Sequence, residues 1–565
     1  MSTPASHSSA RNAQAGTAAK QPLLEINDLV VSYGTAKGLV HAVNNVSLQV
    51  HPGQITAIVG ESGSGKSTTA QAVIGLLADN AAIDSGEITF NGQSLVGLKP
   101  REWKQLRGTR IGLIPQDPNN SLNPVKTIGA SVGEGLAIHR RGTAETRKKR
   151  VIELLDRVGI DNPEVRYEQY PHELSGGMKQ RALIAAAIAL EPELIIADEP
   201  TSALDVTVQK IILDLLEEMQ EELGLGILFI THDLAVAGDR ADQIVVMQKG
   251  EVRESGHAAS VLTDPQDAYS RQLLADAPSL AIGGVPARIP AVDPGEAKAK
   301  GPLLVVDNFL KEYQRGKDDV FVAVDNVSFE VFPGTTHAVV GESGSGKTTI
   351  GRAISAFNTP TSGSITVAGQ EITTLNKSQQ RELRREVQLV YQNPYSSLDP
   401  RQTIGTTIGE PLRNFTNLSK QEISRKVVEY LDLVALDPQM ASRRPRELSG
   451  GQRQRVAIAR AMILEPELVV FDEAVSALDV TVQAQILRLL DELQRELGLT
   501  YVFISHDLAV VREISDTVSV LSRGQQVEHG RTADVFNNPQ SDFTRQLIDA
   551  IPGSRYRGGD LNLGL

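Results

Sequence analysis

The chain has 565 residues, of which 41% are hydrophobic and 22% charged, a composition typical of a soluble globular protein with more than one domain. Its net charge of −13 argues against a general attraction to nucleic acid, and the absence of cysteine excludes disulfides, thiolate zinc sites and cysteine-ligated iron–sulfur clusters. The longest apolar run, Ala182 to Leu190, is well short of the roughly 20 residues that cross a bilayer as a helix.

The N-terminal segment, residues 1–21, is rich in Ser, Ala and Gln and has no apolar core that could direct secretion. We therefore expect a disordered tail, followed by a protein that is cytoplasmic and does not span a membrane.

The first chemical motif is the loop GESGSGKS, which follows a predicted strand, ITAIV (55–59), and precedes an apolar helical segment. Strand, glycine-rich loop and helix form the setting in which backbone N–H groups converge on phosphates. Lys66 then reaches the terminal phosphate oxygens, and the Ser67 hydroxyl can bind Mg²⁺. The candidate phosphate-binding residues are Gly60, Ser62, Gly63, Gly65, Lys66, Ser67 and Thr68.

Further along the chain, ELSGG precedes a helical segment, and ELIIADEP ends a second predicted strand in two acids. Asp198 is placed to complete a Mg²⁺ shell, and Glu199 to polarise water as a general base. ELSGG on its own is also a common way to begin a helix, because Ser caps helices and Gly permits tight turns. After these motifs, residues 208–224 predict an amphipathic helix whose apolar face holds Val208, Ile211, Ile212, Leu215, Met219 and Leu223 and which Gly224 ends.

All of these motifs recur in the second half of the chain, so that Gly341 corresponds to Gly60 and Ser449 to Ser175. The two halves differ only by small insertions, and the long repeat indicates a domain duplication rather than a solenoid. The repeated loop contributes Gly341, Ser343, Gly344, Gly346, Lys347, Thr348 and Thr349, and the repeated acids are Asp472 and Glu473.

The spacing between the later motifs is identical in the two halves. The interval from the LSGG serine to the aspartate is the same for Ser175 to Asp198 as for Ser449 to Asp472. The interval from the glutamate to a histidine is also the same for Glu199 to His232 as for Glu473 to His506. Equal spacing over three motifs is more than turn chemistry alone predicts.

Strands that alternate with helices predict an α/β fold with a mainly parallel sheet, whose functional groups lie at the carboxyl ends of its strands. Between the halves, residues 281–302 are rich in Pro, Gly and Ala and predict an exposed linker.

With these motifs, the sequence resembles the nucleotide-binding subunits of ABC transporters over residues 22–280 and 302–550. The resemblance implies two tandem P-loop ATPase domains, each with a mainly parallel core sheet, an antiparallel β subdomain and a helical subdomain. It also implies two ATP molecules sandwiched head to tail, with the LSGG helix of one half facing the phosphates bound by the other. One site would combine Lys66, Ser67, Gln116, Asp198, Glu199 and His232 with Ser449, Gly450 and Gly451. The other would combine Lys347, Thr348, Gln392, Asp472, Glu473 and His506 with Ser175, Gly176 and Gly177.

The same resemblance assigns roles to side chains whose chemistry alone is ambiguous. It makes His232 and His506 γ-phosphate contacts, makes Gln116 and Gln392 additional Mg²⁺ ligands, and places Tyr33 and Tyr313 where adenine stacks. Each tyrosine is equally consistent with ordinary packing. The visible departure is Ala474, where the first half has Pro200, and this puts equal activity of the two sites in doubt.

Two features indicate a branch of the family. DPNNSLNP after Gln116 and NPYSSLDP after Gln392 look like the segments that follow the glutamine in peptide- and nickel-type importers. DPQDAYSRQLLADAP and NPQSDFTRQLIDAIP resemble the C-terminal extensions of oligopeptide transporter ATPases, although a generic amphipathic helix fits them too. We therefore divide the chain into a tail (1–21), a first ATPase domain (22–262) with its extension (263–280), a linker (281–302), and a second ATPase domain (303–536) with its extension and tail (537–565).

The resemblance predicts an ATPase that uses ATP and Mg²⁺ to power import of di- or oligopeptides or similar small solutes. Its partners would be two membrane permeases and an extracytoplasmic solute-binding protein, with no nucleic acid, and it would lie on the cytoplasmic face of a bacterial membrane. The alternatives are a soluble tandem ATPase that acts on ribosomes or nucleic acid, and an exporter ATPase. The sequence does not identify the solute.

Overall fold

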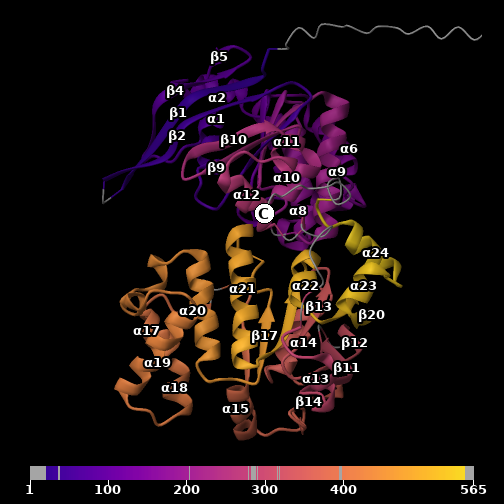
Figure 1. Ribbon diagram of the computed structural model, residues 1–565. Helices are drawn as coiled ribbons and strands as arrows, with labels where there is room; N and C mark the ends of the chain where they lie inside the picture. The colour runs from indigo at the N-terminus through magenta and orange to yellow at the C-terminus, as the bar shows by residue number, and fades with distance from the viewer. Residues whose placement is uncertain are drawn as a thin grey trace, which may run out of the picture.

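The computed structural model describes residues 21–35, 38–202, 204–277, 279–280, 288, 290–314, 316, 319–393, 397–476 and 478–553. Nearly all of the expected N-terminal tail, the start of the linker and the end of the C-terminal tail lie outside these residues. The chain forms two halves of the same architecture, the first (indigo to magenta) above and the second (rose to yellow) below in Figure 1. The predicted tandem α/β fold is confirmed.

The first half has two sheets. The antiparallel sheet has the order β2-β1-β4-β5, and the core sheet has the order β10-β9-β3-β8-β7-β6, in which only β10 is antiparallel to its neighbour. The strands are β1 (Leu24–Thr35), β2 (Gly38–Val50), β3 (Ile55–Val59), β4 (Ala81–Phe90), β5 (Gln93–Ser94), β6 (Ile111–Ile114), β7 (Leu194–Asp198), β8 (Gly226–Ile230), β9 (Gln243–Gln248) and β10 (Glu251–His257).

Helices cover the core sheet and form the helical subdomain of the first half. The helices are α1 (Lys66–Ile74), α2 (Pro100–Leu106), α3 (Pro118–Ser121), α4 (Ile128–Val132), α5 (Glu134–Ile138), α6 (Ala144–Arg157), α7 (Pro163–Glu168), the 3₁₀ helix η1 (Pro171–Glu173), α8 (Gly176–Ile188), α9 (Val206–Leu223), α10 (Leu234–Arg240), α11 (Ala258–Thr263) and α12 (Ala268–Ala275). Because β3, β6, β7 and β8 are apolar along most of their length, their two faces require this covering on both sides.

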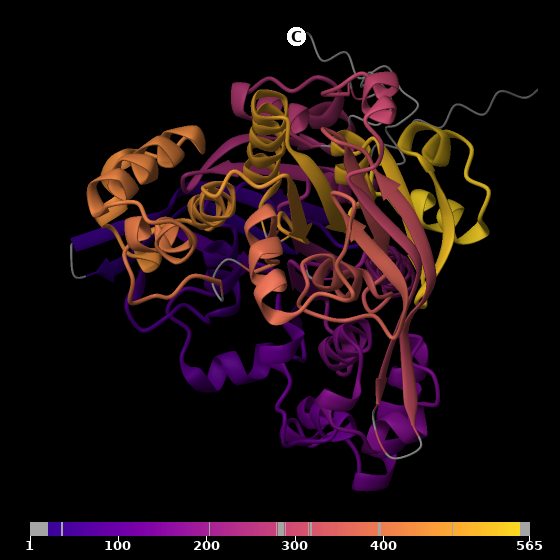
Figure 2. The same ribbon diagram turned by 90° about the horizontal axis from the view of Figure 1, so that it is seen from below.

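The second half repeats this arrangement, but its strands join in one sheet of order β15-β14-β11-β12-β20-β19-β13-β18-β17-β16. Its strands are β11 (Leu304–Gln314), β12 (Val320–Val331), β13 (Thr336–Gly341), β14 (Ser362–Val367), β15 (Gln370–Glu371), β16 (Val387–Val390), β17 (Leu468–Asp472), β18 (Thr500–Ser505), β19 (Thr517–Ser522) and β20 (Gln525–Arg531). Its helices are α14 (Lys347–Ile354), α15 (Lys377–Glu386), α17 (Ile404–Ile408), α18 (Glu410–Phe415), α19 (Lys420–Leu433), η3 (Pro438–Ser442), η4 (Pro445–Glu447), α20 (Gly450–Met462), α21 (Val480–Leu497), α22 (Leu508–Ile514), α23 (Thr532–Asn537) and α24 (Asp542–Asp549). Figure 2 shows the orange helices of the helical subdomain on one side of this sheet and the yellow α23 and α24 on the other.

Helix α9 forms where the sequence predicts a helix and ends as expected at Gly224, whose φ of 62° makes a left-handed turn. It begins earlier than expected, at Val206, because the Asp205 side chain caps it. Its buried face differs from the expected one, because Ile211 and Leu223 are 46% and 40% exposed. The buried residues centre on Ile212 and cluster on one side of the helix, so apolar residues at the edges of the stripe remain in contact with water.

The end of the linker, which we expected to be exposed, instead packs on the second half. The Arg288 side chain is only 7% exposed and pairs with Asp516 at 3.2 Å. The linker then forms a short helix, α13 (Pro294–Ala299), which begins because the Asp293 carboxylate accepts hydrogen bonds from two N–H groups of its first turn. A composition rich in Pro and Gly therefore did not prevent this segment from docking.

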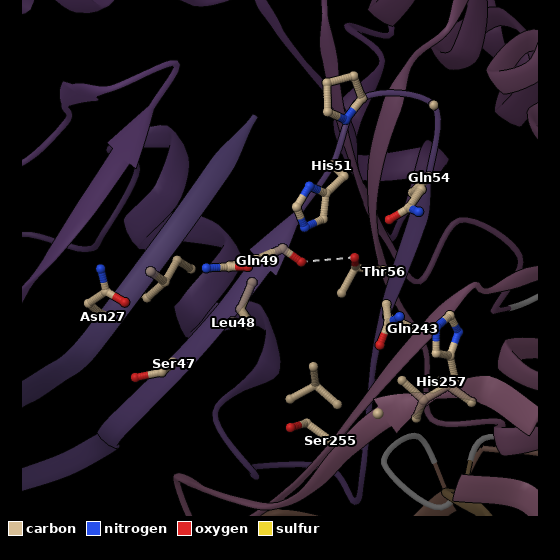
Figure 3. A pocket seen from close by; sticks show the side chains of 16 residues that line it. Asn27, Ser47, Leu48, Gln49, His51, Gln54, Thr56, Gln243, Ser255 and His257 are labelled. Atoms are coloured by element: carbon tan, nitrogen blue, oxygen red, sulfur yellow. Dashed lines mark hydrogen bonds between the residues drawn. The ribbon is translucent and has the colours of Figure 1, made fainter. Parts of the chain in front are cut away.

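The two halves differ at the junction between the β subdomain and the core sheet. In the first half, Asn44 of β2 donates its N–H to the carbonyl of Gly250, the residue before β10, at 2.8 Å, and the two strands then diverge around a pocket of about 940 Å³ (Figure 3). The pocket is lined by Ile26, Asn27, Ser47, Leu48, Gln49, His51, Pro52, Gly53, Gln54, Thr56, Gln243, Ile244, Val245, Ser255, Gly256 and His257. None of these is Lys, Arg, Asp or Glu, so the pocket does not have the charge that a triphosphate needs.

In the second half, larger side chains occupy the corresponding space. His337 stacks on Phe329 at 4.3 Å between ring centroids and lies 5.7 Å from His529, while the Gln526 amide donates to Ser519 at 3.0 Å. The aligned residues of the first half are Thr56, Leu48, Ser255, Val252 and Val245. Most of these first-half side chains are smaller than their second-half counterparts, and the others cannot form the corresponding hydrogen bond. The junction between the β subdomain and the core sheet is therefore open in the first half and filled by side chains in the second.

Candidate nucleotide-binding sites

The two glycine loops have the same backbone conformation. Gly60 and Gly341 have φ of 147° and 148°, and a Cβ at either position would lie 2.1 Å from a carbonyl oxygen of the neighbouring strand. Only glycine fits there. The loops end where α1 and α14 begin, so the N–H groups of both helix starts face the space that each loop encloses.

The loop lysines fold back over their own loops. Lys66 Nζ donates to the carbonyl oxygens of Gly60 and Glu61 at 2.6 and 2.8 Å, and Lys347 does the same in the second half at 2.8 Å to both carbonyls. Burial lowers the pKa of Lys66, and the carboxylates of Glu199 and Asp479 partly offset this effect. A buried ammonium whose hydrogen bonds go to backbone carbonyl groups is suited to exchange these bonds for phosphate oxygens.

Each metal-site pair predicted from the sequence comes together. Ser67 Oγ donates to Asp198 Oδ1 at 3.0 Å, and Thr348 Oγ1 donates to Asp472 Oδ1 at 2.9 Å. The aspartates end β7 and β17, and the hydroxyls belong to the first turns of α1 and α14. Burial raises the pKa of both aspartates, and the hydroxyl donors partly oppose this rise. In each half a hydroxyl and a carboxylate oxygen, atoms of the hard type that Mg²⁺ prefers, therefore lie next to each other.

The adjacent glutamate of the first half lies at the centre of a small polar cluster. Glu199 Oε2 accepts a hydrogen bond from Gln116 Nε2 at 2.8 Å and lies 3.4 Å from His232 Nδ1. Burial raises the pKa of Glu199, but His232, Lys66 and Gln116 outweigh burial and lower it overall. The pKa of His232 is raised, because the interaction with Glu199 outweighs the burial that would lower it. Glu199 is therefore an ionised carboxylate in a partly buried site, as a general base requires.

The second half repeats this cluster with one addition. Glu473 Oε2 accepts from Gln392 at 2.7 Å and lies 3.4 Å from His506, and Glu473 Oε1 also lies 3.8 Å from Lys347 Nζ. Both glutamates have left-handed backbones, with φ of 44° at Glu199 and 49° at Glu473. A non-glycine residue in this region is strained, and such strain is common at functional sites. The replacement of Pro200 by Ala474 leaves the second cluster intact.

The role of Gln116 and Gln392 as Mg²⁺ ligands stays a prediction, since it would use their side-chain oxygens. The structure directs their amide nitrogens to the glutamates.

The LSGG segments begin helices as expected. The hydroxyls of Ser175 and Ser449 each accept an N–H from the first turn of their helix at 3.3 Å, which makes them the caps of α8 and α20. Among the described residues, neither serine hydrogen-bonds to the loop of the opposite half. Gly177 and Gly451 allow close packing, because a Cβ there would lie 2.5 and 2.4 Å from a valine methyl of the following helix.

Contacts between the halves cross over at the loops that follow the Asp-Glu pairs. Thr207 of the first half donates to Glu342, in the second glycine loop, at 2.9 Å. Val206 belongs to a buried cluster otherwise made of second-half residues, and Val480 belongs to one otherwise made of first-half residues. Helix α24 also lies against α9 (Figure 1). The halves therefore meet in a reciprocal, head-to-tail manner.

The two tyrosines that resemblance places near adenine have different surroundings. The Tyr33 hydroxyl lies 3.3 Å from Thr68 Oγ1, at the start of α1. The Tyr313 hydroxyl instead accepts from Asn358 at 3.3 Å, and its ring lies under Lys311. Sequence reasoning missed another tyrosine, Tyr269 of the first extension, whose hydroxyl accepts the Glu61 N–H at 3.2 Å. The visible signal was that only one of the two extensions has tyrosine at this position.

The fold and the doubled sites define the class as a P-loop ATPase with two nucleotide sites in one chain. A family model described as ABC transporter matches residues 43–202 and 324–476, more than half of the chain. The chain belongs to the ABC transporter family, and it is an ATPase of the kind that is coupled to transport.

Several relatives are similar over almost their whole length. The peptidoglycan transport ATP-binding protein YejF of Agrobacterium fabrum is 44% identical over 94% of this chain and 96% of its own. The glutathione import ATP-binding protein GsiA of Salmonella choleraesuis is 42% identical over 95% of this chain and 91% of its own. The oligopeptide transport ATP-binding protein OppD of Mycobacterium tuberculosis is 40% identical over 94% of this chain and 98% of its own.

Proposed function

We propose that this chain is the ATP-hydrolysing subunit of an importer for di- or oligopeptides or a similar small solute. The observation that carries this proposal is the similarity, over about nine-tenths or more of each chain, to relatives named for peptidoglycan transport, glutathione import and oligopeptide transport. The cargoes in these names all contain peptide linkages. A solute of that chemical class is the simplest common inference.

Within each half, the arrangement supports hydrolysis of a bound ATP. Lys66 and the N–H groups at the start of α1 would hold the phosphates, Glu199 would take a proton from the attacking water, and His232 would orient the terminal phosphate. The second half would use Lys347, Glu473 and His506 in the same roles, since their geometry is the same.

The residues present fit a magnesium ion in each half. Ser67 with Asp198 and Thr348 with Asp472 would hold it, and Mg²⁺ would supply neutralisation of phosphate charge. Among the described residues there is no group of three or more His, Asp or Glu side chains arranged to hold a metal. This agrees with an ion that completes its shell with phosphate oxygens and water, as Mg²⁺ commonly does.

The head-to-tail contact supports composite sites, in which Ser449 would complete the first site and Ser175 the second. Both serines cap helices whose N-terminal N–H groups could bind an anion. ATP would draw each serine toward the opposite loop.

The division into two ATPase domains with extensions stays a proposal, as do the partners and the location. None of the helices formed by the described residues combines the length and hydropathy that a membrane span requires. By analogy with the relatives, we propose that two separate permeases form the membrane pathway, that a solute-binding protein delivers the cargo, and that the chain lies on the cytoplasmic face of the membrane.

Co-purification from native membranes in mild detergent, followed by mass spectrometry, tests this function. We expect two polytopic permeases and a solute-binding protein with a peptide-like ligand. Ribosomal proteins or nucleic acid without a permease would overturn the transport assignment and leave the ATP sites standing.

A further inference from the structure

The two glycine loops carry a glutamate at the same position, and these glutamates have different partners. The Glu342 carboxylate lies 2.9 Å from the Thr207 hydroxyl of the other half, which shares its one proton between Glu342 and Asp205, at 2.8 Å. The hydroxyl of Tyr269, in the same half as Glu61, instead accepts the Glu61 N–H at 3.2 Å and also interacts with the Glu61 carboxylate. One loop is tied across the boundary between the halves, and the other is tied to its own extension.

The internal repeat predicts a contact that the structure does not make. Thr481 corresponds to Thr207, because the segment LDVTVQ occurs at both positions, and it should face Glu61 as Thr207 faces Glu342. Thr481 is only 5% exposed, yet its hydroxyl has no hydrogen-bond partner among the described residues. A buried hydroxyl without a partner is costly, so a specific feature must keep it from its expected acceptor.

The extensions that carry the difference are otherwise held alike. In the first half the Glu254 carboxylate accepts the N–H groups of Gln266 and Asp267 at 2.8 and 3.2 Å. In the second half Glu528 accepts the corresponding N–H groups at 2.8 and 3.1 Å. Because the frame is shared, the difference lies in the side chain that each helix carries at the matching position, which is Tyr269 on α12 and Phe543 on α24.

The hydroxyl of Tyr269 is well placed for a lasting contact. The residue is 7% exposed, and burial raises the pKa of Tyr269 to about 12, so the hydroxyl keeps its proton. Its neighbour Glu61 also lies within electrostatic range of Asp479, from the second half.

We propose that Tyr269 is a positioning residue that ties the first phosphate loop to its own extension and withholds Glu61 from Thr481. The hydroxyl-to-glutamate bond between the halves then forms at the second ATP site only. Both sites have all of the residues assigned to ATP binding and hydrolysis. They differ in whether a hydrogen bond joins their phosphate loop to the other half when the two halves come together. This inference rests on the assignment of Glu199 and Glu473 as the bases of the two sites.

A double-mutant cycle on the full chain tests the inference. E473Q leaves the first site active and E199Q leaves the second, and KM for ATP and kcat are measured in each background. T481V should change KM of the first site less than about two-fold, because its hydroxyl has no partner among the described residues. In the Y269F background the same T481V substitution should raise KM by roughly three- to ten-fold, the range of one hydrogen bond, with a smaller change in kcat.

T207V is the matched control and should raise KM of the second site by a similar factor without Y269F. The reciprocal variant F543Y should make T207V silent, because the new hydroxyl would hold Glu342. A purely structural Tyr269 would lower the melting temperature and leave the effect of T481V unchanged. Equal effects of T481V with and without Y269F, or of T207V with and without F543Y, would overturn the proposal. Full turnover in the E199Q/E473Q variant would instead overturn the assigned bases, and binding of a fluorescent ATP analogue would still report on the cycle.

Discussion

The strongest test of the assigned sites is replacement of Glu199 and Glu473 by Gln. Each glutamine keeps one side-chain oxygen that can accept the hydrogen bonds now made by Gln116 and His232 or by their second-half counterparts. The left-handed backbone is also kept, since the main chain is unchanged. The substitution therefore removes the basic carboxylate with little disturbance of the geometry.

The expected loss of turnover follows from the role of the carboxylate. A positioned general base contributes about 10²–10⁴-fold to rate, which is about 3–5 kcal/mol of barrier. The double variant should lose turnover by this factor and bind ATP with affinity within roughly three-fold of the wild type, because the phosphate contacts come from the loop. Each single variant should retain the turnover of the remaining site.

The assay is phosphate release at saturating ATP, with equilibrium binding of ATP measured separately. Glu191→Gln is a matched control, since Glu191 has the same left-handed backbone, with φ of 56°, but pairs with Arg150 at the surface. That variant should hydrolyse ATP normally. If the double variant kept turnover within about ten-fold of the wild type, neither glutamate could be the base.

Other substitutions test the remaining features. Gly60→Ala should raise KM for ATP at the first site roughly ten-fold or more. The reason is that a Cβ would lie 2.1 Å from a carbonyl oxygen, which puts a strain of about 1–3 kcal/mol on the loop. An unchanged KM would show that the loop adapts. Arg288→Ala should lower the free energy of unfolding of the second half by about 3 kcal/mol in denaturant, because it leaves the Asp516 carboxylate without its buried cationic partner. An unchanged free energy of unfolding would show that the linker does not contribute to the stability of the second half. Burial lowers the pKa of His337 well below its usual value, so only the unfolded state takes up this proton as pH falls below about 6.5. Stability should therefore fall by up to about 1.4 kcal/mol per pH unit between about pH 6.5 and 5, and His337→Gln should flatten that slope; an identical slope would contradict the buried neutral state.

The sequence was sufficient for the parts of the site whose chemistry is contiguous. The glycine loop, the Asp-Glu pair and the LSGG cap each lie on a single strand-to-helix or loop-to-helix turn, so residue type and spacing predicted their place in the fold. The left-handed backbone of Glu199 and Glu473 was not predicted. The pairing of Ser67 with Asp198 also followed, because parallel strands bring their carboxyl ends to one edge.

The missed features depend on packing between distant segments. Arg288 is buried because Asp516, from the far end of the second half, lies against it, and no local pattern encodes that meeting. The direction of the Gln116 amide toward Glu199 was likewise set by tertiary geometry. An alignment of the two halves shows that Thr56 stands where the second half has the larger His337. This difference indicates an open junction only when the sheet order is known, because the sheet order places both residues at the junction.

Covalent fusion changes the kinetics of closing. Two separate ATPase subunits must find each other, and their association depends on concentration. Here the linker helix and Arg288 anchor the connection to the second half, so each half meets the other at an effective concentration fixed by the chain itself. Closing becomes a first-order event that dilution does not weaken. Fusion also ensures that every molecule contains one first half and one second half. If the two permeases differ from each other, each of them can therefore meet the same half in every complex.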